Sequence, residues 1–295
     1  MDIACISSTA SDLGESLYWD AGARRLYWID AWASTVHGLD PATGEVRAFD
    51  LSAALAGKPI GSIAAAATGG MISGVKGGFY QLDLDRHAAR SLAAIETDRP
   101  LTNRLNDGKC DRAGRFWCAS ANTDHRTASG ALWRFAGGLP VLMQDGLIVG
   151  NGIAFSPDDR FFYLADTLAG QVWRYDFDLA SGEIGNRRLF IATTHIRGSV
   201  DGATVDADGC YWAALFRGGA IAQFDPDGKL MRHIGLPVSQ PTICAFGGPD
   251  LDVLYVASAK RFLDEGQRRG EPLAGRLFAI HGLDVRGLPE PRFCQ

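Results

Sequence analysis

Oxygen-bearing side chains recur at equivalent places in this 295-residue chain. Each place lies about 10 to 12 residues before a pair of apolar or aromatic residues, and the six occupants are Glu15, Gly61, Asn106, Asn151, Asp201 and Thr242. Carboxylates and carboxamides are hard oxygen donors that suit a divalent cation, and the set contains no imidazole or thiolate, the softer donors typical of zinc. If the fold brings these places together, they predict a metal site.

Taken singly, these residues have simpler explanations. Asn151-Gly152 has the composition of a tight hairpin turn, because both residue types tolerate the positive φ angles that such a turn needs. Glu15 is explained equally well as a solvated loop residue. Only their shared phase in the sequence favours the metal site over turns and loops.

The elements that must position these residues follow from an internal repeat. Apolar or aromatic pairs recur every 43 to 49 residues, at Tyr27-Trp28, Met71-Ile72, Phe116-Trp117, Phe162-Tyr163, Tyr211-Trp212 and Leu254-Tyr255. This period is typical of propeller blades, and each repeat contains short strand-like runs separated by Gly- and Asp-rich turns. We therefore predict an all-β, six-bladed β-propeller with four-stranded blades, forming one domain over residues 1–295.

In such a propeller the innermost strands surround a central channel, so equivalent first residues form a ring at one mouth. The metal site is therefore expected at one mouth of the central channel. The Ala-rich segment 63–67 is predicted to be an inner strand, and 52–57 could form one helical turn. Residues 2–8 are expected to pair in the last blade and close the ring. The long segments 120–130 and 259–275 fall on the mouth that carries the ring.

Composition and charge limit the partners. The net charge of -5 comes from acids and bases mixed along the chain, which disfavours nucleic acid as a partner. The N-terminus lacks a signal pattern and no run approaches a membrane span, so we expect a cytoplasmic protein with no membrane partner, either monomeric or a weak homo-oligomer. The six cysteines are dispersed without CxxC spacing, lie mostly in apolar strand-like segments, and are interpreted as reduced core thiols.

Other polar residues carry weaker signals. Structural roles in turns are predicted for Asp107, Asp111 and Asp206, whereas the roles of Asp30 and Asp166 are left open. Arg104 could brace a nearby carboxylate or hydrogen-bond a substrate. Of the scattered histidines only His125 lies in a mouth loop, and no G-x-S-x-G motif or phosphate-binding glycine loop supports a serine esterase or a nucleotide enzyme.

The chain also resembles a known family in nearly its whole length. The segments that carry the resemblance are LGESLYWD, NRLNDGKCDRAGRFW, GNGIAFSPDDRFFYLADT, GEIGNRR, SVDGATVDADGCYWAAL and CAFGGPDLDVLYVASA. They are similar to the SMP-30/gluconolactonase/regucalcin family of six-bladed propellers. The resemblance implies one divalent metal ion held by Glu15, Asn151 and Asp201, with Arg104 and Asn106 contacting the substrate.

The sequence departs from the family pattern beside two of these residues. Ser16-Leu17 stands where the family usually has Gly-Pro, and Val200 replaces the usual Pro before Asp201. These changes could reshape the backbone without removing a metal ligand. An acidic substrate contact of some members falls near Asp124, where a loop makes the alignment weak.

Two functional hypotheses follow. In the first, the protein is a metal-dependent hydrolase that opens a sugar (aldono) lactone to the aldonic acid, using Ca, Mg, Mn, Zn or Fe(II), with Asp201 as a general base that the resemblance suggests. In the second, it is a non-catalytic propeller that binds calcium or presents a protein-interaction face with exposed apolar patches. The sequence favours the enzyme, because the predicted mouth residues are polar groups that match hydroxyls.

Overall fold

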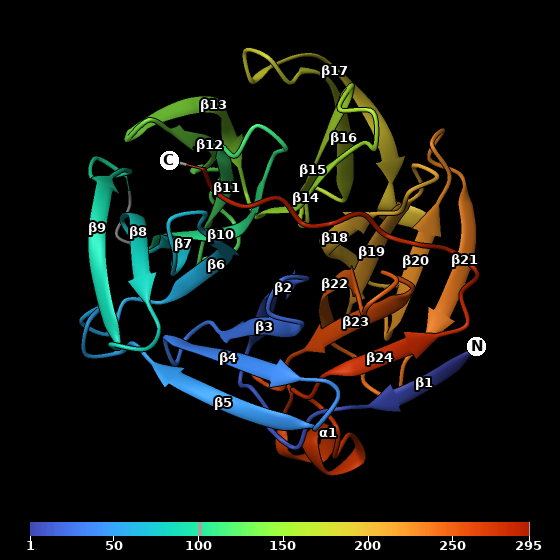
Figure 1. Ribbon diagram of the computed structural model, residues 1–295. Coiled ribbons are helices and arrows are strands. Elements are labelled where there is room, and N and C mark those ends of the chain that lie inside the picture. The colour runs from blue at the N-terminus through green and yellow to red at the C-terminus, as the bar shows by residue number, and fades with distance from the viewer. Residues whose placement is uncertain (100–101, 295) are drawn as a thin grey trace.

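The computed structural model describes residues 1–99 and 102–294. Its strands form six four-stranded sheets arranged as the blades of a ring (Figure 1), which confirms the predicted six-bladed propeller. Neighbouring strands within every blade pair in antiparallel fashion; for example, β2 pairs with β3 from Gly14 opposite Asp30 to Asp20 opposite Arg25. The ring thereby brings segments that are far apart in sequence to one axis.

The blades follow the chain in order. The first blade contains β2 (Gly14–Asp20), β3 (Arg25–Asp30), β4 (Thr35–Asp40) and β5 (Glu45–Asp50). The second contains β6 (Ile60–Ala65), β7 (Met71–Val75), β8 (Gly78–Asp83) and β9 (Ala88–Ala94). The third contains β10 (Asn103–Cys110), β11 (Phe116–Asn122), β12 (Gly130–Ala136) and β13 (Leu139–Leu147).

The remaining blades repeat this pattern. The fourth contains β14 (Gly150–Phe155), β15 (Phe161–Asp166), β16 (Gln171–Asp178) and β17 (Glu183–Ala192). The fifth contains β18 (Ser199–Val205), β19 (Tyr211–Phe216), β20 (Ala220–Phe224) and β21 (Leu230–Gly235), preceded by the short 3-10 helix η1 (Thr193–His195). The sixth contains β22 (Pro241–Gly247), β23 (Val253–Ser258), β24 (Phe278–His281) and β1 (Asp2–Cys5).

The last blade takes its outer strand from the N-terminus, as predicted. Asp2 pairs with His281 and Cys5 with Phe278, and the backbone N–H of Ile6 donates to the carbonyl of Leu277 at 2.9 Å. Strand β1 thus covers the edge of β24 that would otherwise be unpaired. The pairing joins the two ends of the chain within one sheet and closes the ring.

Burial follows distance from the axis. All six residues of β6 and of β14 are buried, because inner strands are enclosed by their neighbours on both sides. The outermost strand β5 is exposed or partly buried throughout. The Ala-rich segment therefore forms an inner strand, as predicted, since small side chains fit the crowded axis despite their helix propensity.

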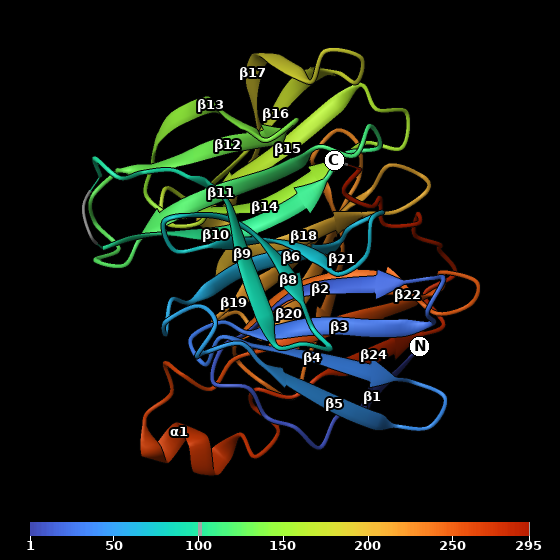
Figure 2. The ribbon, with the colours of Figure 1, turned by 60° about the vertical axis from the view of Figure 1, so that its left-hand side comes forward.

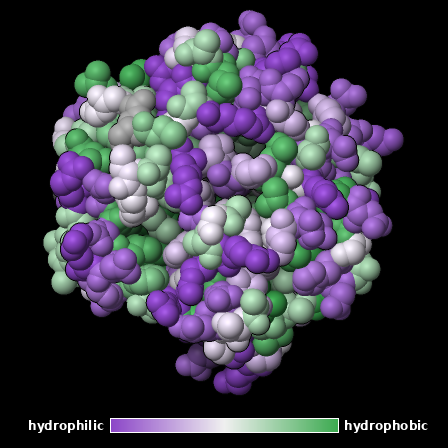
Figure 3. Space-filling model, viewed as in Figure 1, coloured by the Kyte–Doolittle hydropathy of each residue, from purple (hydrophilic) through white to green (hydrophobic). Residues whose placement is uncertain are grey.

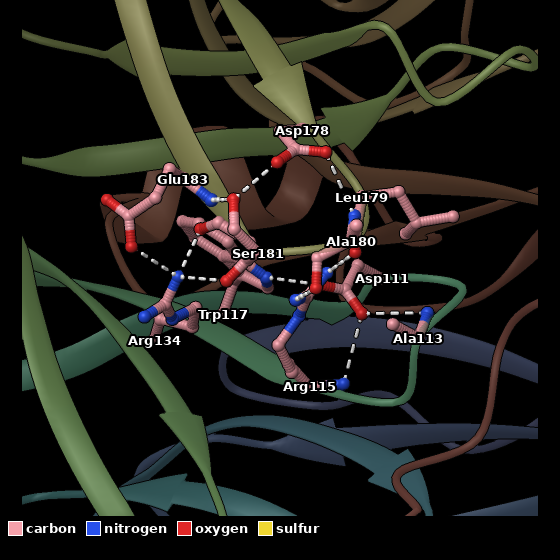
Figure 4. Close-up of polar contacts among 11 residues, drawn as sticks. Asp111, Ala113, Arg115, Trp117, Arg134, Asp178, Leu179, Ala180, Ser181 and Glu183 are labelled. Carbon is pink, nitrogen blue, oxygen red and sulfur yellow. Dashed lines mark hydrogen bonds and ion pairs between the residues drawn. The ribbon is translucent and has the colours of Figure 1, made fainter.

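Arginines tie one blade to the next. Arg115 donates to the carbonyl of Leu179 at 2.5 Å, and Arg134 donates to the carbonyl of Ser181 at 3.1 Å, so both reach the hairpin between β16 and β17 (Figure 4). Arg115 also pairs with Asp111 at 2.6 Å with both side chains almost fully buried. The third and fourth blades are therefore joined by polar contacts as well as by their apolar interface.

The C-terminal segment crosses the ring on the face away from the predicted mouth. Phe293 donates through its backbone N–H to Ala65 at the end of β6, at 2.9 Å, and Glu290 pairs with Lys109 at 2.8 Å. In Figure 2 the arrowheads of β2 and β14 point toward the C-terminus, whereas the helix α1 (Glu265–Gly270) lies on the opposite side. The repeat in the sequence does not predict where this C-terminal segment runs. Hydrophilic and hydrophobic residues are intermixed on the face seen in Figure 3.

Three further expectations concern local structure and the burial of the cysteines. Segment 259–275 contains α1, a six-residue helix that begins with a capping box between Asp264 and Gln267, although no helix was expected there. Segment 52–57 forms turns, and the backbone N–H of Leu55 donates to the carbonyl of Leu51 at 2.9 Å, which is the single helical turn that was expected. All six cysteines are free, but only four are buried, because Cys5 and Cys294 lie near the chain ends and are exposed. No helix of residues 1–99 and 102–294 has the length and apolar character needed to cross a membrane.

Candidate active site

Bulges in the inner strands direct the predicted ring residues. The pairing register of each inner strand shifts at the predicted position: after Glu15 in β2, after Leu105 in β10, after Asn151 in β14 and after Val200 in β18. Strands β6 and β22 shift at Gly61 and Thr242 in the same way. A bulge interrupts the regular ladder and re-aims the side chain beside it. The repeat phase found in the sequence therefore coincides, to within one residue, with a bulge in every inner strand.

Asn151-Gly152 forms no hairpin turn, so the turn explanation is wrong. The pair lies within β14, where Gly152 adopts a φ of 58°. A Cβ added at Gly152 would stand 2.4 Å from the hydroxyl of Tyr211, which itself donates to the carbonyl of Gly152 at 2.8 Å. The glycine is required because the bulge needs a positive φ and leaves no room for a side chain.

Four of the six ring residues line one cavity of about 200 Å³, namely Glu15, Asn106, Asn151 and Asp201. The other two are used for packing. A Cβ at Gly61 would lie 2.3 Å from the carbonyl oxygen of Leu105, so that position has room only for glycine. Thr242 donates its hydroxyl to the carbonyl of Gly14 in the first blade. The cavity therefore collects two carboxylates and two carboxamides, as the sequence predicted.

The two carboxamides are hydrogen-bonded to each other. Asn106 donates through Nδ2 to Oδ1 of Asn151 at 2.7 Å and to the carbonyl of Gly150 at 3.0 Å. Asn151 donates through its own Nδ2 to the hydroxyl of Thr167 at 2.7 Å. Both amide groups are therefore held in one orientation, with the Asn151 carbonyl oxygen directed away from Thr167.

The two cavity carboxylates repel each other in the ionised form. Burial raises the pKa of Glu15 well above its usual range, and the charges of Asp201 and Asp107 raise it further, while Arg104 opposes the shift. Burial and the charge of Asp107 likewise raise the pKa of Asp201. The pocket thus gathers negative charge that Arg104 alone offsets incompletely.

The position predicted for Asp107 is wrong. It was predicted to be a turn residue, but it lies inside β10, buried beneath the cavity. Its carboxylate accepts a hydrogen bond from the backbone N–H of Ile153 at 2.8 Å, which ties β10 to the bulge of β14. Burial raises its pKa. Its place next to Asn106 in the N-D-G sequence could not distinguish a bulged inner strand from a turn.

A divalent cation fits this donor set. The described residues contain no grouping of three or more His, Cys, Asp or Glu suited to a metal, so a cation here would be held by two carboxylates completed by an amide oxygen. Oxygen donors of this kind suit hard cations. Positive charge between Glu15 and Asp201 would also relieve the repulsion that raises their pKa values.

Arg104 lies at the edge of the cavity and braces no carboxylate, since none of its contacts with the described residues is an ion pair. It donates to the carbonyl of Leu105 at 3.2 Å, its guanidinium lies 5.7 Å from the ring centroid of Trp32, and its Nε is buried without a hydrogen-bond partner. Arg261 contacts the same indole at 4.6 Å. The guanidinium is thus oriented by stacking and retains unused donors.

The mouth is less polar than expected. Besides the polar residues, the cavity is lined by Leu13, Val149, Leu168, Phe216 and Phe262. Phe216 ends β19 and the other four lie outside the strands, in segments whose contribution the repeat could not predict. His125 also lines it, whereas Asp124 does not. The Asp124 carboxylate accepts hydrogen bonds from the Thr127 hydroxyl and from the backbone N–H groups of Thr127 and Arg126, and these bonds lower its pKa. The predicted substrate contact at Asp124 therefore has no support from this cavity.

Asp30 and Asp166, whose roles the sequence left undecided, have structural roles. Asp30 accepts from the backbone N–H groups of Asp12 and Leu13, at 2.8 and 3.2 Å, and thereby fixes the segment that enters β2. Asp166 does the same for Ile148 and Val149, ahead of β14. These carboxylates hold the strand starts that carry Glu15 and Asn151.

A larger groove of about 830 Å³ lies between the first two blades, but none of the predicted site residues lines it.

Comparisons with known proteins show similarity to one family over most of the chain. The model of the SMP-30/Gluconolactonase/LRE-like region matches residues 13–260. Regucalcin of Xenopus laevis is 32% identical over 99% of this chain and 98% of its own, and the 6-deoxy-6-sulfogluconolactonase of Pseudomonas putida is 35% identical over 99% and 98%. The crystal structure of the calcium-binding protein regucalcin from Agrobacterium tumefaciens superposes with a TM-score of 0.92 at 28% identity, over 99% of this chain and 97% of that one.

Proposed function

Because the chain belongs to the SMP-30/Gluconolactonase/LRE-like family, we propose that it is a divalent-metal-dependent hydrolase that opens a sugar lactone to the corresponding aldonic acid. The observation that carries this proposal is the composition of one cavity, which combines the carboxylates of Glu15 and Asp201 with the guanidinium of Arg104. A relative that is 35% identical over almost the full length is named as a lactonase.

The metal would be held by the oxygens of Glu15, Asn151 and Asp201, three residues that line the cavity together. When bound, the ion supplies Lewis acidity that polarises the lactone carbonyl. Calcium, magnesium and manganese match the oxygen donors best, with zinc and Fe(II) as further candidates. The name of the Agrobacterium relative as a calcium-binding protein supports a divalent ion at this site.

The side chains of this protein would position the substrate and move one proton. Arg104 keeps unused donors at the cavity edge, so it can hydrogen-bond a substrate hydroxyl or the carbonyl oxygen. Asn106 has both amide hydrogens committed, and therefore offers its carbonyl oxygen to a hydroxyl donor.

Asp201 would act as the general base. Its carboxylate lines the cavity together with Arg104 and Asn106, so in its ionised form it can accept a proton from a water molecule beside the lactone carbonyl. It would take a proton from water as the water oxygen bonds to the carbonyl carbon. The bond between that carbon and the ring oxygen would then break as Asp201 returns the proton to the ring oxygen, which leaves as a hydroxyl group.

The decisive experiment is a lactone panel assayed with one metal at a time. Protein stripped with a chelator and reconstituted with each ion is given γ- and δ-lactones of pentonic and hexonic acids, and acid release is titrated. We expect turnover only with metal, and at least a hundredfold loss in Asp201→Asn, which loses the base and one ligand charge. Metal binding without turnover of any lactone would support the cation-binding propeller instead.

A further inference from the structure

We propose that Thr167 is a positioning residue for the metal site: its hydroxyl sets which atom of the Asn151 amide faces the cavity. The inference rests on the proposed role of Asn151 as a metal ligand. Thr167 follows β15 directly, lines the same cavity and is partly buried. It lies outside the phase of the sequence repeat.

The hydroxyl of Thr167 has only one possible hydrogen-bond arrangement here. Its oxygen lies 2.9 Å from the carbonyl of Val200, which can only accept, so the single hydroxyl hydrogen must point there. The lone pairs then face Asn151, whose Nδ2 lies 2.7 Å away. Only the NH2 end of the amide can satisfy them, so Oδ1 must point to the other side.

The opposite end of the amide is fixed by the same logic. Asn106 donates through Nδ2 to the carbonyl of Gly150 at 3.0 Å. A carbonyl can only accept, so the NH2 group of Asn106 must face it. The same NH2 group reaches Oδ1 of Asn151 at 2.7 Å. A directed chain therefore runs from Asn106 through Asn151 and Thr167, with a backbone carbonyl at each end. An inverted Asn151 amide would place two donors against Asn106 and two acceptors against Thr167.

Thr167 also acts on the second ligand strand. Val200 is the residue before Asp201, and it is almost fully buried at the bulge of β18. Its carbonyl accepts the hydrogen bond from the Thr167 hydroxyl, so the Thr167 side chain connects the strand of Asn151 to the strand of Asp201. Removal of the hydroxyl would leave Asn106 alone to orient the amide of Asn151, and would free the carbonyl of Val200 that precedes Asp201. We therefore expect it to weaken cation binding while leaving the protein folded.

The test compares Thr167→Val with Thr167→Ser by calorimetric titration of calcium and manganese into full-length, metal-free protein. Valine keeps the shape and removes the hydroxyl, so the dissociation constant should rise at least tenfold; serine restores the hydroxyl and should stay within threefold of the wild type. Thr123→Val is the matched control, because Thr123 also donates to a backbone carbonyl, that of Thr102 at 3.0 Å, without contacting a ligand residue. It should leave the dissociation constant unchanged.

A second arm tests the orientation argument itself. In Asn151→Asp both terminal atoms are oxygens, so no orientation remains to be selected, and adding Thr167→Val should raise the dissociation constant less than it does in the wild type, because only the effect through the Val200 carbonyl remains. If Thr167→Val does not fold, Thr167→Ala serves as the hydroxyl-free variant, because a smaller side chain cannot clash. Melting temperatures of the metal-free variants report folding independently of metal.

The outcomes separate this inference from the proposed function. A wild-type protein that binds no divalent ion would overturn both. Tight binding by the wild type with an equal dissociation constant in Thr167→Val would overturn the positioning role and leave the proposed function standing. Equal weakening in Thr167→Val and Thr167→Ser would assign the effect to packing by the methyl group, and would also overturn the role of the hydroxyl.

Discussion

The indole N–H of Trp117 donates to a carboxylate oxygen of Asp111 at 2.9 Å, and both side chains are fully buried. Two blades later in the chain, Trp212 donates to Asp206 at 2.8 Å with the same separation of six residues. Both aspartates also cap the turn before the aromatic strand through backbone N–H groups. The aromatic repeat in the sequence is therefore maintained by a buried polar contact as well as by packing.

The two aspartates should differ in their contribution to stability. Asp111→Ala leaves Arg115 buried without its ion partner, whereas the partners of Asp206 are neutral groups, including Gln223. We expect Asp111→Ala to lower the free energy of unfolding by about 3–5 kcal/mol, and Asp206→Ala by about 1–3 kcal/mol. Urea denaturation of both variants measures the difference. Equal losses would show that the Arg115 pair adds nothing.

Gly61 should tolerate no side chain. A Cβ at Gly61 would meet the backbone of Leu105 at 2.3 Å, and backbone cannot rotate away. Gly61→Ala should therefore lower the free energy of unfolding by about 1–3 kcal/mol or more. Gly185→Ala is the control, because nothing lies within 4 Å of its added Cβ; it should change stability by less than about 0.5 kcal/mol. Similar unfolding curves for the two variants would contradict the crowded inner ring.

Loss of the N-terminal strand should open the ring. Deletion of residues 1–5 removes the four pairs from Asp2 opposite His281 to Cys5 opposite Phe278, and exposes the edge of β24. We expect a melting temperature lower by several degrees and concentration-dependent association, because an unpaired edge offers a template for another chain. Calorimetry and size-exclusion chromatography measure these effects. Full retention of the melting temperature would mean that β1 contributes little to closure.

His37 should make the protein less stable in mild acid. It is buried and stacks on Trp28 at 4.9 Å between ring centroids, and burial lowers its pKa despite the charge of Asp30. Below the unfolded-state pKa of 6.5, the unfolded chain takes up a proton that the folded protein resists. Stability is therefore fully present above that pH and decreases as the pH falls through it.

The variant His37→Phe keeps an aromatic stacking partner for Trp28 and removes the titration. Between about pH 7.5 and 5.5, the wild type should lose more unfolding free energy than this variant, as measured by urea denaturation at each pH. Other titrating groups contribute equally to both proteins. Parallel pH profiles would exclude His37 as the source.

Arg104 should affect catalysis without supporting metal binding. Arg104→Gln removes charge-assisted hydrogen bonds worth about 1.5–3 kcal/mol, so kcat/KM for the best lactone should fall at least tenfold. Metal affinity should not fall, because the removed charge repels a cation. Arg261→Gln is the control, since Arg261 contacts the same Trp32 but does not line the cavity. A parallel loss of metal affinity in Arg104→Gln would refute the assignment.

The sequence by itself determined the repeat and its phase. The aromatic pairs, the spacing of 43 to 49 residues and the strand-like N-terminus were sufficient to predict six closed blades, because each blade is a local unit with its own turns. The same phase identified Glu15, Asn106, Asn151 and Asp201 as residues of one mouth, and the cavity contains all four.

The tertiary structure decided how those residues are used. Gly61 and Thr242 share the phase but face a neighbouring backbone, and Asp107 turns out to be buried under the cavity, since only contacts between blades specify such packing. Thr167 lies outside the repeat phase, and its role depends on the carbonyl of Val200, 33 residues away. A periodic sequence fixes the position of each residue within its blade, whereas hydrogen bonds between blades depend on how the blades meet at the axis.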